Sequence, residues 1–476
     1  MTVRSLFFFL GLLVIVSLLA ACGITEPSPT LPPPPTPVTS DQPPPIVIEL
    51  GTLPATAQET AVADSSPTPI QTPTLAPTAT PTEEPEPVID PAKMPAINQD
   101  LLFVGNGKLK RWQRDGNVVS LLDGDVVDYS LSKDGKQAVV AQLVASTEIS
   151  NTVTAVTQTV NTYALNSVNL ETGDTQRLVP AVNSFKDPAF QLSQDGRFVT
   201  FSGMGLGDAH ALTLGEEVQN DLYVMEIGTG QSPKKIDACG AYCEGMVWHQ
   251  DNNFFVFGSD DGLFLYNLAA TKPELLLAGN GNLFTPLSWA KNGRWLLLRG
   301  EDMNGADYFV FDIPTKQLMI VPYTNASDGF PYADVTWMQD DRLFMVRNDS
   351  DTAVGETWRV NADANEVQRD ESVILSEEHL RPWAPVHWAN GRFSYGLLDM
   401  DKNTTSLYQR IAFNEPAELI NSVPEAASNL GITWSPDGSG PIVHVDGTVY
   451  YVPTHGELVD LTTAVGLRGH NFTWLP

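Results

Sequence analysis

Two cysteines and a few acidic pairs are the side chains whose types and spacing could do chemistry. Cys239 and Cys243 are close in sequence, and in an exported chain such a pair most often forms a disulfide, worth about 2 kcal/mol through loop closure. A zinc site that adds His249 is the alternative, although it lacks an obvious fourth ligand. A redox pair would usually have two intervening residues rather than three. We predict a disulfide that pins the loop before the next strand.

Alternating acidic residues at two predicted hairpins are candidate ligands for a metal ion. Asp399 and Asp401, and likewise Asp349 and Asp351, place carboxylates at every second position, and calcium prefers such oxygen ligands. Neither segment continues into the glycine and distant bidentate glutamate of a helix-loop-helix calcium site, and exposed hairpins use the same residue types. We predict no cofactor and no metal ligand, and a structural calcium ion remains the alternative.

Catalytic motifs do not stand out in this sequence. The seven histidines are scattered, and none occurs in a His-x-x-x-His spacing. A Gly-x-Ser-x-Gly elbow and the Ser-x-Asp-x-Gly-x-x-Trp boxes of sialidases are also missing. Two carboxylates that meet in space could still hydrolyse a glycoside, but no specific pair is indicated. We name no catalytic residue, and the sequence favours a role without catalysis while leaving an enzyme open.

A repeat must position these residues. The clearest copy, Thr433-Trp434-Ser435-Pro436-Asp437-Gly438, reads as a strand followed by a tight turn, because Asp bonds the backbone two residues on and Gly takes a positive φ. Degenerate copies recur every 40 to 60 residues or so, the period of a four-stranded propeller blade. The aligned positions are 131, 192, 248, 289, 337, 388, 434 and 474.

Short runs of β-branched and aromatic residues follow the better copies, separated by Gly, Asp and Asn. Examples are 197–201, 221–226, 294–298 and 308–312. No helical period is sustained, so the prediction is all-β. Tryptophan stands at most aligned positions, and we expect it to pack between neighbouring sheets; a ring of aromatic ligand platforms is the alternative.

The phrase Thr-Trp-Ser-Pro-Asp-Gly, with Leu222-Tyr223-Val224-Met225 as a third strand, resembles the repeats of TolB-like (WD40-like) β-propellers. The resemblance covers nearly all of residues 97–476, but only the copy at Trp434 keeps the full Ser-Pro-Asp-Gly. The N-terminal domain of TolB itself has no counterpart here. The resemblance therefore implies the propeller fold and not the partners of TolB.

The two ends of the repeat region complement each other. Residues 100–122 read as three strands without an innermost one, and residues 471–475 read as an innermost strand alone. Together they predict one blade closed by strands from both termini, which removes exposed sheet edges. With seven internal copies, this gives eight four-stranded blades. Seven blades are the alternative if an early copy is spaced by something else.

Long insertions between the strands fall mainly on one face of such a propeller. They lie between second and third strands, or between an outer strand and the next inner one, and these connections open on the same side. Loops commonly carry function, so this is the predicted binding face. The candidate binding residues there are His210, Asp302, Asp307, Asp349, Asp351, His379, Trp383, Asp399 and Asp401.

The N-terminus indicates export and an anchor. Arg4 precedes an uncharged apolar run, 6–19, that is short for a membrane span and typical of a secretion signal. Its end, Leu19-Ala20-Ala21-Cys22, resembles the lipobox of bacterial lipoproteins. The resemblance implies cleavage before Cys22, diacylglycerol on its sulfur and an acyl group such as palmitate on its amine. An ordinary secretory signal is the alternative.

Composition then divides the chain. We predict a signal peptide over residues 1–21, a disordered Pro/Thr-rich linker over 22–95 that begins with lipidated Cys22, and the propeller over 96–476, because the linker has too little apolar mass to fold. The chain has a net charge of −30, most of it in the propeller region, which disfavours nucleic acid as a partner.

These observations predict a lipoprotein of a bacterial cell membrane that faces the extracytoplasmic side. Its propeller, expected to be monomeric, would act as a binding or scaffold module for a protein, peptide or glycan. A carbohydrate- or peptidoglycan-active enzyme with carboxylates on the loop face is one alternative. An accessory subunit of an envelope complex is the other.

Overall fold

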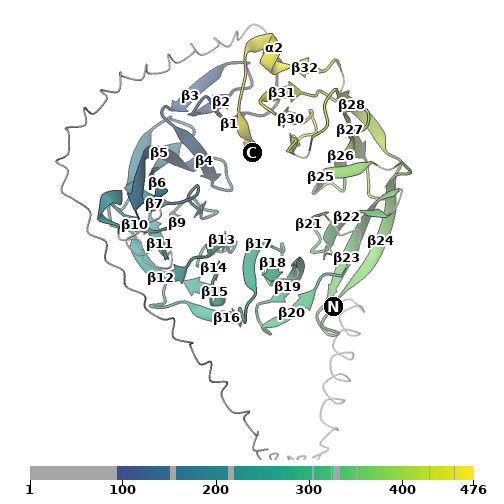
Figure 1. Cartoon of the computed structure of the whole chain (residues 1–476). Coiled ribbons are helices and arrows are strands. Elements are labelled where there is room, and N and C mark those ends of the chain that lie inside the picture. The colour runs from purple at the N-terminus through teal and green to yellow at the C-terminus, as the bar shows by residue number, and fades with distance from the viewer. Residues whose placement is uncertain are drawn as a thin grey trace, which may run out of the picture. The chain divides into compact units, whose positions relative to one another are not determined.

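Eight antiparallel sheets follow one another around a ring in the computed structural model (Figure 1). All described residues belong to one compact unit, Thr82–Pro476. The predicted signal peptide, Cys22 and nearly all of the predicted linker lie outside the described residues. The structure describes residues 94–476 except 151–156, 213–218, 303–304, 323, 325–332, 350–351, 379, 428 and 455.

Each sheet is one blade, with its first strand nearest the centre of the ring. Adjacent strands within a blade pair antiparallel. Blade 1 consists of β33 (His470–Trp474), β1 (Leu101–Gly105), β2 (Lys108–Trp112) and β3 (Val118–Leu122). Blade 2 consists of β4 (Val126–Leu131), β5 (Gln137–Ser150), β6 (Thr157–Asn169) and β7 (Thr175–Ser184), with β10 (Gly205–Leu206) added at its edge. Blade 3 consists of β8 (Phe190–Leu192), β9 (Phe198–Gly203), β11 (Asn220–Glu226) and β12 (Lys234–Gly240).

The remaining blades take four consecutive strands each. Blade 4 consists of β13 (Cys243–Trp248), β14 (Phe254–Ser259), β15 (Gly262–Asn267) and β16 (Glu274–Ala278). Blade 5 consists of β17 (Leu283–Trp289), β18 (Trp295–Asp302), β19 (Gly305–Asp312) and β20 (Gln317–Ile320). Blade 6 consists of β21 (Ala333–Trp337), β22 (Leu343–Asp349), β23 (Thr352–Asn361) and β24 (Glu366–Ser376). Blade 7 consists of β25 (Arg381–His387), β26 (Phe393–Asp399), β27 (Thr404–Arg410) and β28 (Glu418–Val423). Blade 8 consists of β29 (Gly431–Thr433), β30 (Ile442–Val445), β31 (Thr448–Tyr451) and β32 (Val459–Asp460).

Helical structure is sparse between these strands. The described residues hold the short helix α2 (Leu461–Val465) and the 3₁₀ turn η2 (Ala209–Ala211). No helix in this described part of the chain is long and apolar enough to cross a membrane.

Blade 1 closes the ring with strands from both ends of the repeat region. β33 pairs antiparallel with β1, and Leu101 lies opposite Trp474. The eight-bladed prediction with closure by terminal strands is confirmed, and the seven-bladed alternative is wrong. The blade count could be predicted because all eight aligned repeat positions fall at the end of an innermost strand or one residue beyond it.

The tight turn after each innermost strand is held by local hydrogen bonds. The Ser132 hydroxyl donates to Asp134 at 2.7 Å and accepts from the Gln137 amide at 3.0 Å, which fixes the start of the second strand. Ser193 and Asp195 repeat this pattern, and Ser435 donates to Asp437. The turn then needs a left-handed residue, which glycine tolerates best. These glycines are Gly135, Gly196, Gly293, Gly391 and Gly438.

The tryptophans join neighbouring blades. Each indole at most aligned positions donates its Nε1 hydrogen to a carbonyl of the preceding innermost strand. The prediction that they pack between sheets is therefore correct, since these rings lie in the core and their polar atoms are occupied. The pairs are Trp248 with Gln191 at 3.3 Å, Trp289 with Val247 at 3.4 Å, Trp337 with Ser288 at 3.2 Å, Trp434 with Ala384 at 2.7 Å and Trp474 with Thr433 at 3.1 Å.

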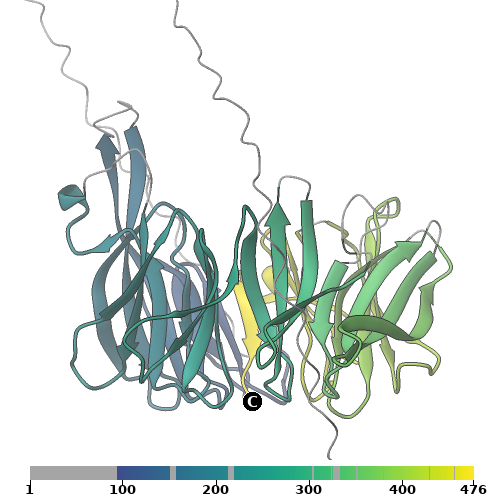
Figure 2. The same ribbon diagram turned by 90° about the horizontal axis from the view of Figure 1, so that it is seen from below.

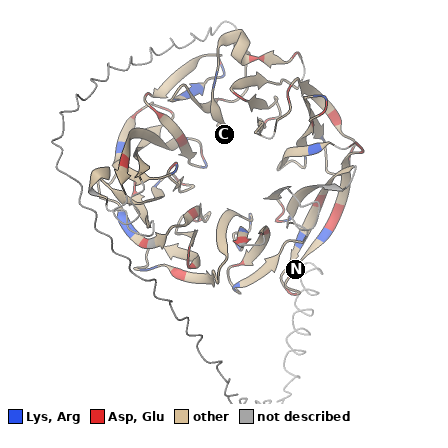
Figure 3. Ribbon diagram, viewed as in Figure 1, with Lys and Arg blue, Asp and Glu red and all other residues tan. Residues whose placement is uncertain are grey.

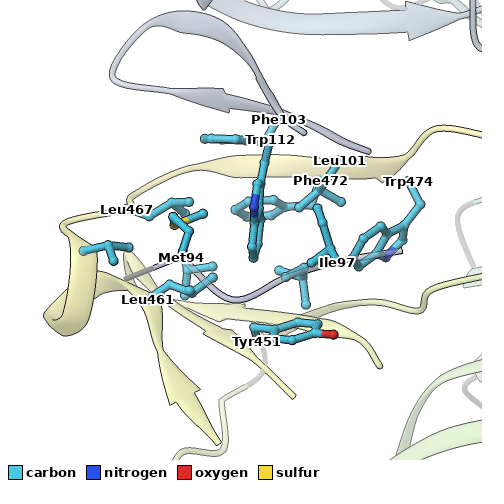
Figure 4. Packing of buried hydrophobic residues seen from close by; sticks show 13 residues of the cluster. Met94, Ile97, Leu101, Phe103, Trp112, Tyr451, Leu461, Leu467, Phe472 and Trp474 are labelled. Atoms are coloured by element: carbon cyan, nitrogen blue, oxygen red, sulfur yellow. The ribbon is translucent and has the colours of Figure 1, made fainter. Parts of the chain in front are cut away.

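Hydrophobic clusters fill the spaces between adjacent blades. The closure seam, defined here as the interface of blades 1 and 8, holds one such cluster, in which Phe103 stacks on Phe472 of the same blade at 5.4 Å between ring centroids. Met94 and Ile97, which precede the first strand, are buried in the same cluster (Figure 4). The first described residues therefore take part in ring closure.

The two faces of the ring differ. We call the face with the tight Ser-x-Asp-Gly turns the turn face, and the opposite face the loop face. Figure 2 shows the long hairpin β5–β6 rising above the loop face, while the C-terminus lies at the turn face. In its described part, the insertion of blade 2 is prolonged strand rather than an irregular loop: β5 runs to Ser150 and β6 starts at Thr157.

Candidate functional site

The β5–β6 hairpin is the most prominent feature of the loop face. Strand β4 pairs with β5 only as far as Gln142, whereas β5 and β6 stay paired out to Ser150 and Thr157. Beyond Asn161 the hairpin is a two-stranded ribbon with most side chains exposed. An isolated two-stranded ribbon is marginal in water, so this one depends on its base.

Polar contacts secure the base of the ribbon. The Ser146 hydroxyl donates to Asn161 at 2.8 Å, and the Asn161 amide donates to the Tyr163 hydroxyl at 3.1 Å. Tyr163 donates in turn to Asp187 at 3.0 Å, at the connection to blade 3. Burial, followed by the bond to Asp187, raises the pKa of Tyr163 to about 12, so it stays a protonated donor.

An insertion of blade 3 braces the same region. After β9 the chain crosses to blade 2, where β10 pairs with β7 and makes the fifth strand of that sheet. The η2 turn follows, capped by Asp208, whose carboxylate accepts from the His210 amide at 3.0 Å. His210, one of the predicted binding residues, is exposed on this insertion.

A disulfide fixes the connection between blades 3 and 4. Cys239 near the end of β12 is joined to Cys243 at the start of β13, with their Cα atoms 5.2 Å apart. Asp260 braces the connecting residues, because its carboxylate accepts from the amides of Ala241 at 2.6 Å and Tyr242 at 3.1 Å. The zinc alternative with His249 does not fit this pairing, since the thiols are consumed.

The other predicted binding residues are spread over blades 5, 6 and 7. Asp307 is half-buried and accepts from the Thr324 hydroxyl at 3.4 Å. Asp302 and Asp349 end strands β18 and β22, but their side chains lie outside the described part of the structure. Asp351 and His379 also lie outside it. The members whose side chains the structure describes, on blades 3, 5 and 7, belong to separate blades.

Trp383 has a structural environment on blade 7. Its indole donates to the Leu430 carbonyl of blade 8, and the Arg381 guanidinium lies 4.6 Å from the ring centroid. The ring is half-buried in the core between blades 7 and 8. This tryptophan therefore resembles the interblade tryptophans more than a free platform for a ligand.

Asp399 and Asp401 form a plain hairpin turn. Asp399 accepts from the Lys402 amide at 2.9 Å and pairs with its ammonium at 2.8 Å. The hydrogen bond from Lys402 lowers the pKa of Asp399 below its usual value, and Asp401 is exposed. Within the described residues, no three His, Cys, Asp or Glu side chains converge as metal ligands.

A cavity of about 500 Å³ opens on the loop face at the closure seam. It lies between the hairpin turns of blades 1 and 8 and the segment that leads into β33. Both turns are of the tight two-residue kind, so this sector stands low beside the tall ribbon of blade 2. Its lining residues are Asn106, Gly107, Asn429, His444, Asp446, Gly447, Arg468, Gly469 and His470.

Close backbone packing shapes this seam cavity. A Cβ on Gly105 would lie 2.8 Å from the Arg468 carbonyl, and one on Gly469 would lie 2.6 Å from the Val104 carbonyl. The segment that carries Arg468 can therefore lie directly against the end of β1. Gly431 is opposite His444 in the sheet, and a Cβ there would meet the imidazole at 2.1 Å.

Two histidines, one aspartate and Arg468 are the titratable residues of the cavity lining. Burial lowers the pKa of His444, and nearby His470 lowers it further, so His444 is neutral at pH 7. Its Nδ1 is buried without a hydrogen-bond partner among the described residues. Asp446 accepts from the Asn429 amide at 2.6 Å.

Asp128 lies at the neighbouring innermost strand of blade 2. Its carboxylate accepts from the Asn471 amide at 2.9 Å and from the Tyr129 amide at 2.7 Å. Burial is the main cause that raises the pKa of Asp128, and the charge of Asp187 raises it as well. The carboxylates of Asp128 and Asp187, both on the loop face, therefore interact electrostatically.

Sequence reasoning did not find this cavity. Arg468, His444 and His470 belong to no repeat position and no motif. His444 lies in β30 of blade 8 and His470 begins β33 of blade 1, so their proximity becomes visible only once blade 1 is known to be composite. Figure 3 shows acidic residues around the ring with Lys and Arg interspersed among them.

Solved structures show what this fold is similar to. No family model and no curated protein sequence matches the chain. A eukaryotic initiation factor is 13% identical with a TM-score of 0.51, covering 79% of this chain and 98% of that one. A prolyl endopeptidase is 12% identical with a TM-score of 0.47 and 72% coverage, and the match spans 51%, about half, of its length. TolB from Acinetobacter baumannii is 14% identical with a TM-score of 0.34, covering 60% of this chain and 65% of TolB. At such identities the similarity concerns the fold alone, which is a β-propeller.

Proposed function

We propose that this chain is a lipid-anchored extracytoplasmic protein whose propeller binds a protein, peptide or glycan through its loop face. The observation that carries the proposal is the asymmetry of the ring. The turn face is built from one repeated short turn, whereas the loop face bears the ribbon of blade 2, the bridging insertion of blade 3 and the seam cavity. A rigid scaffold that varies on one face is the usual arrangement of a binding protein.

The anchor belongs to the proposal through the sequence alone, since Cys22 lies outside the described residues. A Cys22→Ala variant should be recovered in the soluble fraction rather than the membrane fraction. If it stays in the membrane fraction, the lipoprotein assignment is wrong.

The binding proposal is tested by affinity capture from the native envelope with residues 96–476 as bait. Two matched variants accompany the wild type. In one, residues 148–159 are replaced by Asn-Gly, which connects the paired residues Thr147 and Val160 and closes the ribbon near its base with a tight turn. In the other, Arg197→Gln changes the turn face of blade 3, where this arginine pairs with Glu226 at 3.1 Å.

A specific ligand should be captured by the wild type and by Arg197→Gln, and lost or reduced at least fivefold with the shortened ribbon. Equal capture by all three baits would place the binding surface away from the ribbon. Capture of a complete membrane assembly would favour the accessory-subunit role.

A glycoside hydrolase is the second candidate, and one observation favours it. Asp128 and Asp187 interact on the loop face, and the raised pKa of Asp128 suits a general acid. Turnover on a panel of wall and capsular glycans should then appear, and Asp128→Asn should abolish it while Asp399→Asn retains it. Absence of turnover with wild-type protein rejects this candidate.

A further inference from the structure

The closure seam places the cavity where the two ends of the propeller meet. It is lined by His444 of β30 and by the segment Arg468–His470 that leads into β33. The Phe472 ring lies 5.3 Å from the His444 ring. The cavity is therefore backed by packed aromatic rings and rests on strands.

Arg468 is the distinctive charge in this cavity. Its side chain is exposed, and it forms no ion pair with any residue that the structure describes. Most other arginines of the propeller are paired, as Arg294 is with Asp312 at 2.6 Å. An unpaired arginine at the rim of a cavity is suited to an anion, because its planar guanidinium matches carboxylate and phosphate oxygens.

The other polar groups leave room for an anion. Asp446 is the acidic residue of the lining, and the amide of Asn429 already occupies one of its oxygens at 2.6 Å. His470 is exposed beside Arg468 and adds a donor. The His444 imidazole and the Asn106 side chain, which also line the cavity, supply further hydrogen-bonding groups to a ligand.

The geometry points to a binding site for a small ligand, or a terminal group of a larger one, that carries a carboxylate or a phosphate. Arg468 meets the anionic oxygens, and His444, Asn106 and Asn429 bond the polar groups behind them. The cavity volume suits one or two sugar-sized units. The inference rests on the proposed function only in placing this ligand on the loop face.

A strongly anionic polymer is excluded as the preferred occupant. The chain carries a net charge of −30, which repels a polyanion from the surroundings of the cavity. A ligand with a single anionic group is repelled only weakly by the protein and gains the contact with Arg468. The site therefore favours a ligand with one anionic group over a ligand with many.

The test is isothermal titration of residues 94–476 with D-glucuronate, inorganic phosphate and uncharged D-glucose. We expect binding of glucuronate, of phosphate or of both, and much weaker binding of glucose. Glucuronate alone indicates a carboxylated sugar, and phosphate alone indicates a phosphoryl group. Binding of neither anion, or equal binding of glucose, overturns the inference.

Variants separate the site from general charge effects. Arg468→Gln should weaken anion binding about tenfold or more, since a charge-assisted contact is lost. Arg197→Gln, the same change on the turn face, should leave it unchanged. Asp446→Asn should tighten binding severalfold, because it removes a like charge from the lining, and a purely structural role of Asp446 would not produce this gain.

The outcome is independent of the macromolecular capture experiment. If anions bind but no partner is captured, the seam site stands and the proposed function fails. If a partner is captured while wild type and Arg468→Gln bind anions equally, the seam inference fails alone. Thermal unfolding of each variant without ligand verifies that the fold is retained.

Discussion

The two faces of this propeller were built by different rules. On the turn face, the same serine, aspartate and glycine recur in several blades with the same bonds, as at Ser132 and Ser193. On the loop face the connections diverge: blades 1 and 8 keep a tight two-residue turn, whereas blade 2 has a ribbon and blade 3 a bridge. The comparison teaches that repetition marks the structural face and its absence marks the variable one.

The largest effect is expected from removal of the closing strand, β33. Deletion of residues 470–476 removes buried Phe472 and Trp474 and leaves the inner edge of β1 unpaired. Loss of one buried aromatic side chain costs about 3–5 kcal/mol, and whole domains are stable by only about 5–15 kcal/mol. We expect the truncated protein to lose its cooperative thermal transition in calorimetry.

Deletion of Pro476 alone is the matched control, because this exposed residue lies outside the strand. It should retain a cooperative transition. A truncated protein that melts like the wild type would show that the ring does not depend on its terminal strand.

The second prediction compares two tryptophans on opposite ends of innermost strands. Trp248 ends β13 near the turn face and is 2% exposed, whereas Trp383 lies near the start of β25 on the loop-face side and is half-buried. Trp248→Ala should lower the free energy of unfolding by about 3–5 kcal/mol, and Trp383→Ala by roughly half of that.

Urea denaturation monitored by circular dichroism measures both losses. The two variants remove the same side chain and the same type of Nε1 hydrogen bond, so burial is the main difference between them. An equal loss at both sites would contradict the view that the loop face is the less constrained one.

The architecture was predictable because it repeats. Eight aligned positions fixed the innermost strands, and the unpaired runs at 100–122 and 471–475 fixed the closure. The repeat also carried the role of the tryptophans, since a large aromatic residue that recurs at the same position in most blades serves the contact between blades. The TolB-like resemblance pointed to the same fold.

The candidate site was not predictable in the same way. The seam cavity depends on Gly105, Gly431 and Gly469, which matter only because distant backbone segments approach them. Such approaches follow from the composite blade and from strand register, and neither is written in a local motif. At Asp399 the local sequence was ambiguous, because alternating acidic residues occur in calcium sites and also in ordinary hairpin turns.

The smallest predicted effect compares two serines. Ser193 on the turn face is fully buried, donates to Asp195 at 2.7 Å and accepts from the Phe198 amide at 2.9 Å. Ser146 on the loop face is exposed and donates to Asn161 at 2.8 Å. Ser193→Ala leaves a buried amide unpaired and should cost about 1–2 kcal/mol, whereas water replaces the lost bond in Ser146→Ala, which should cost under about 0.5 kcal/mol. Chemical denaturation resolves this difference, and a larger loss at Ser146 would mean that the base of the ribbon belongs to the structural frame of the ring.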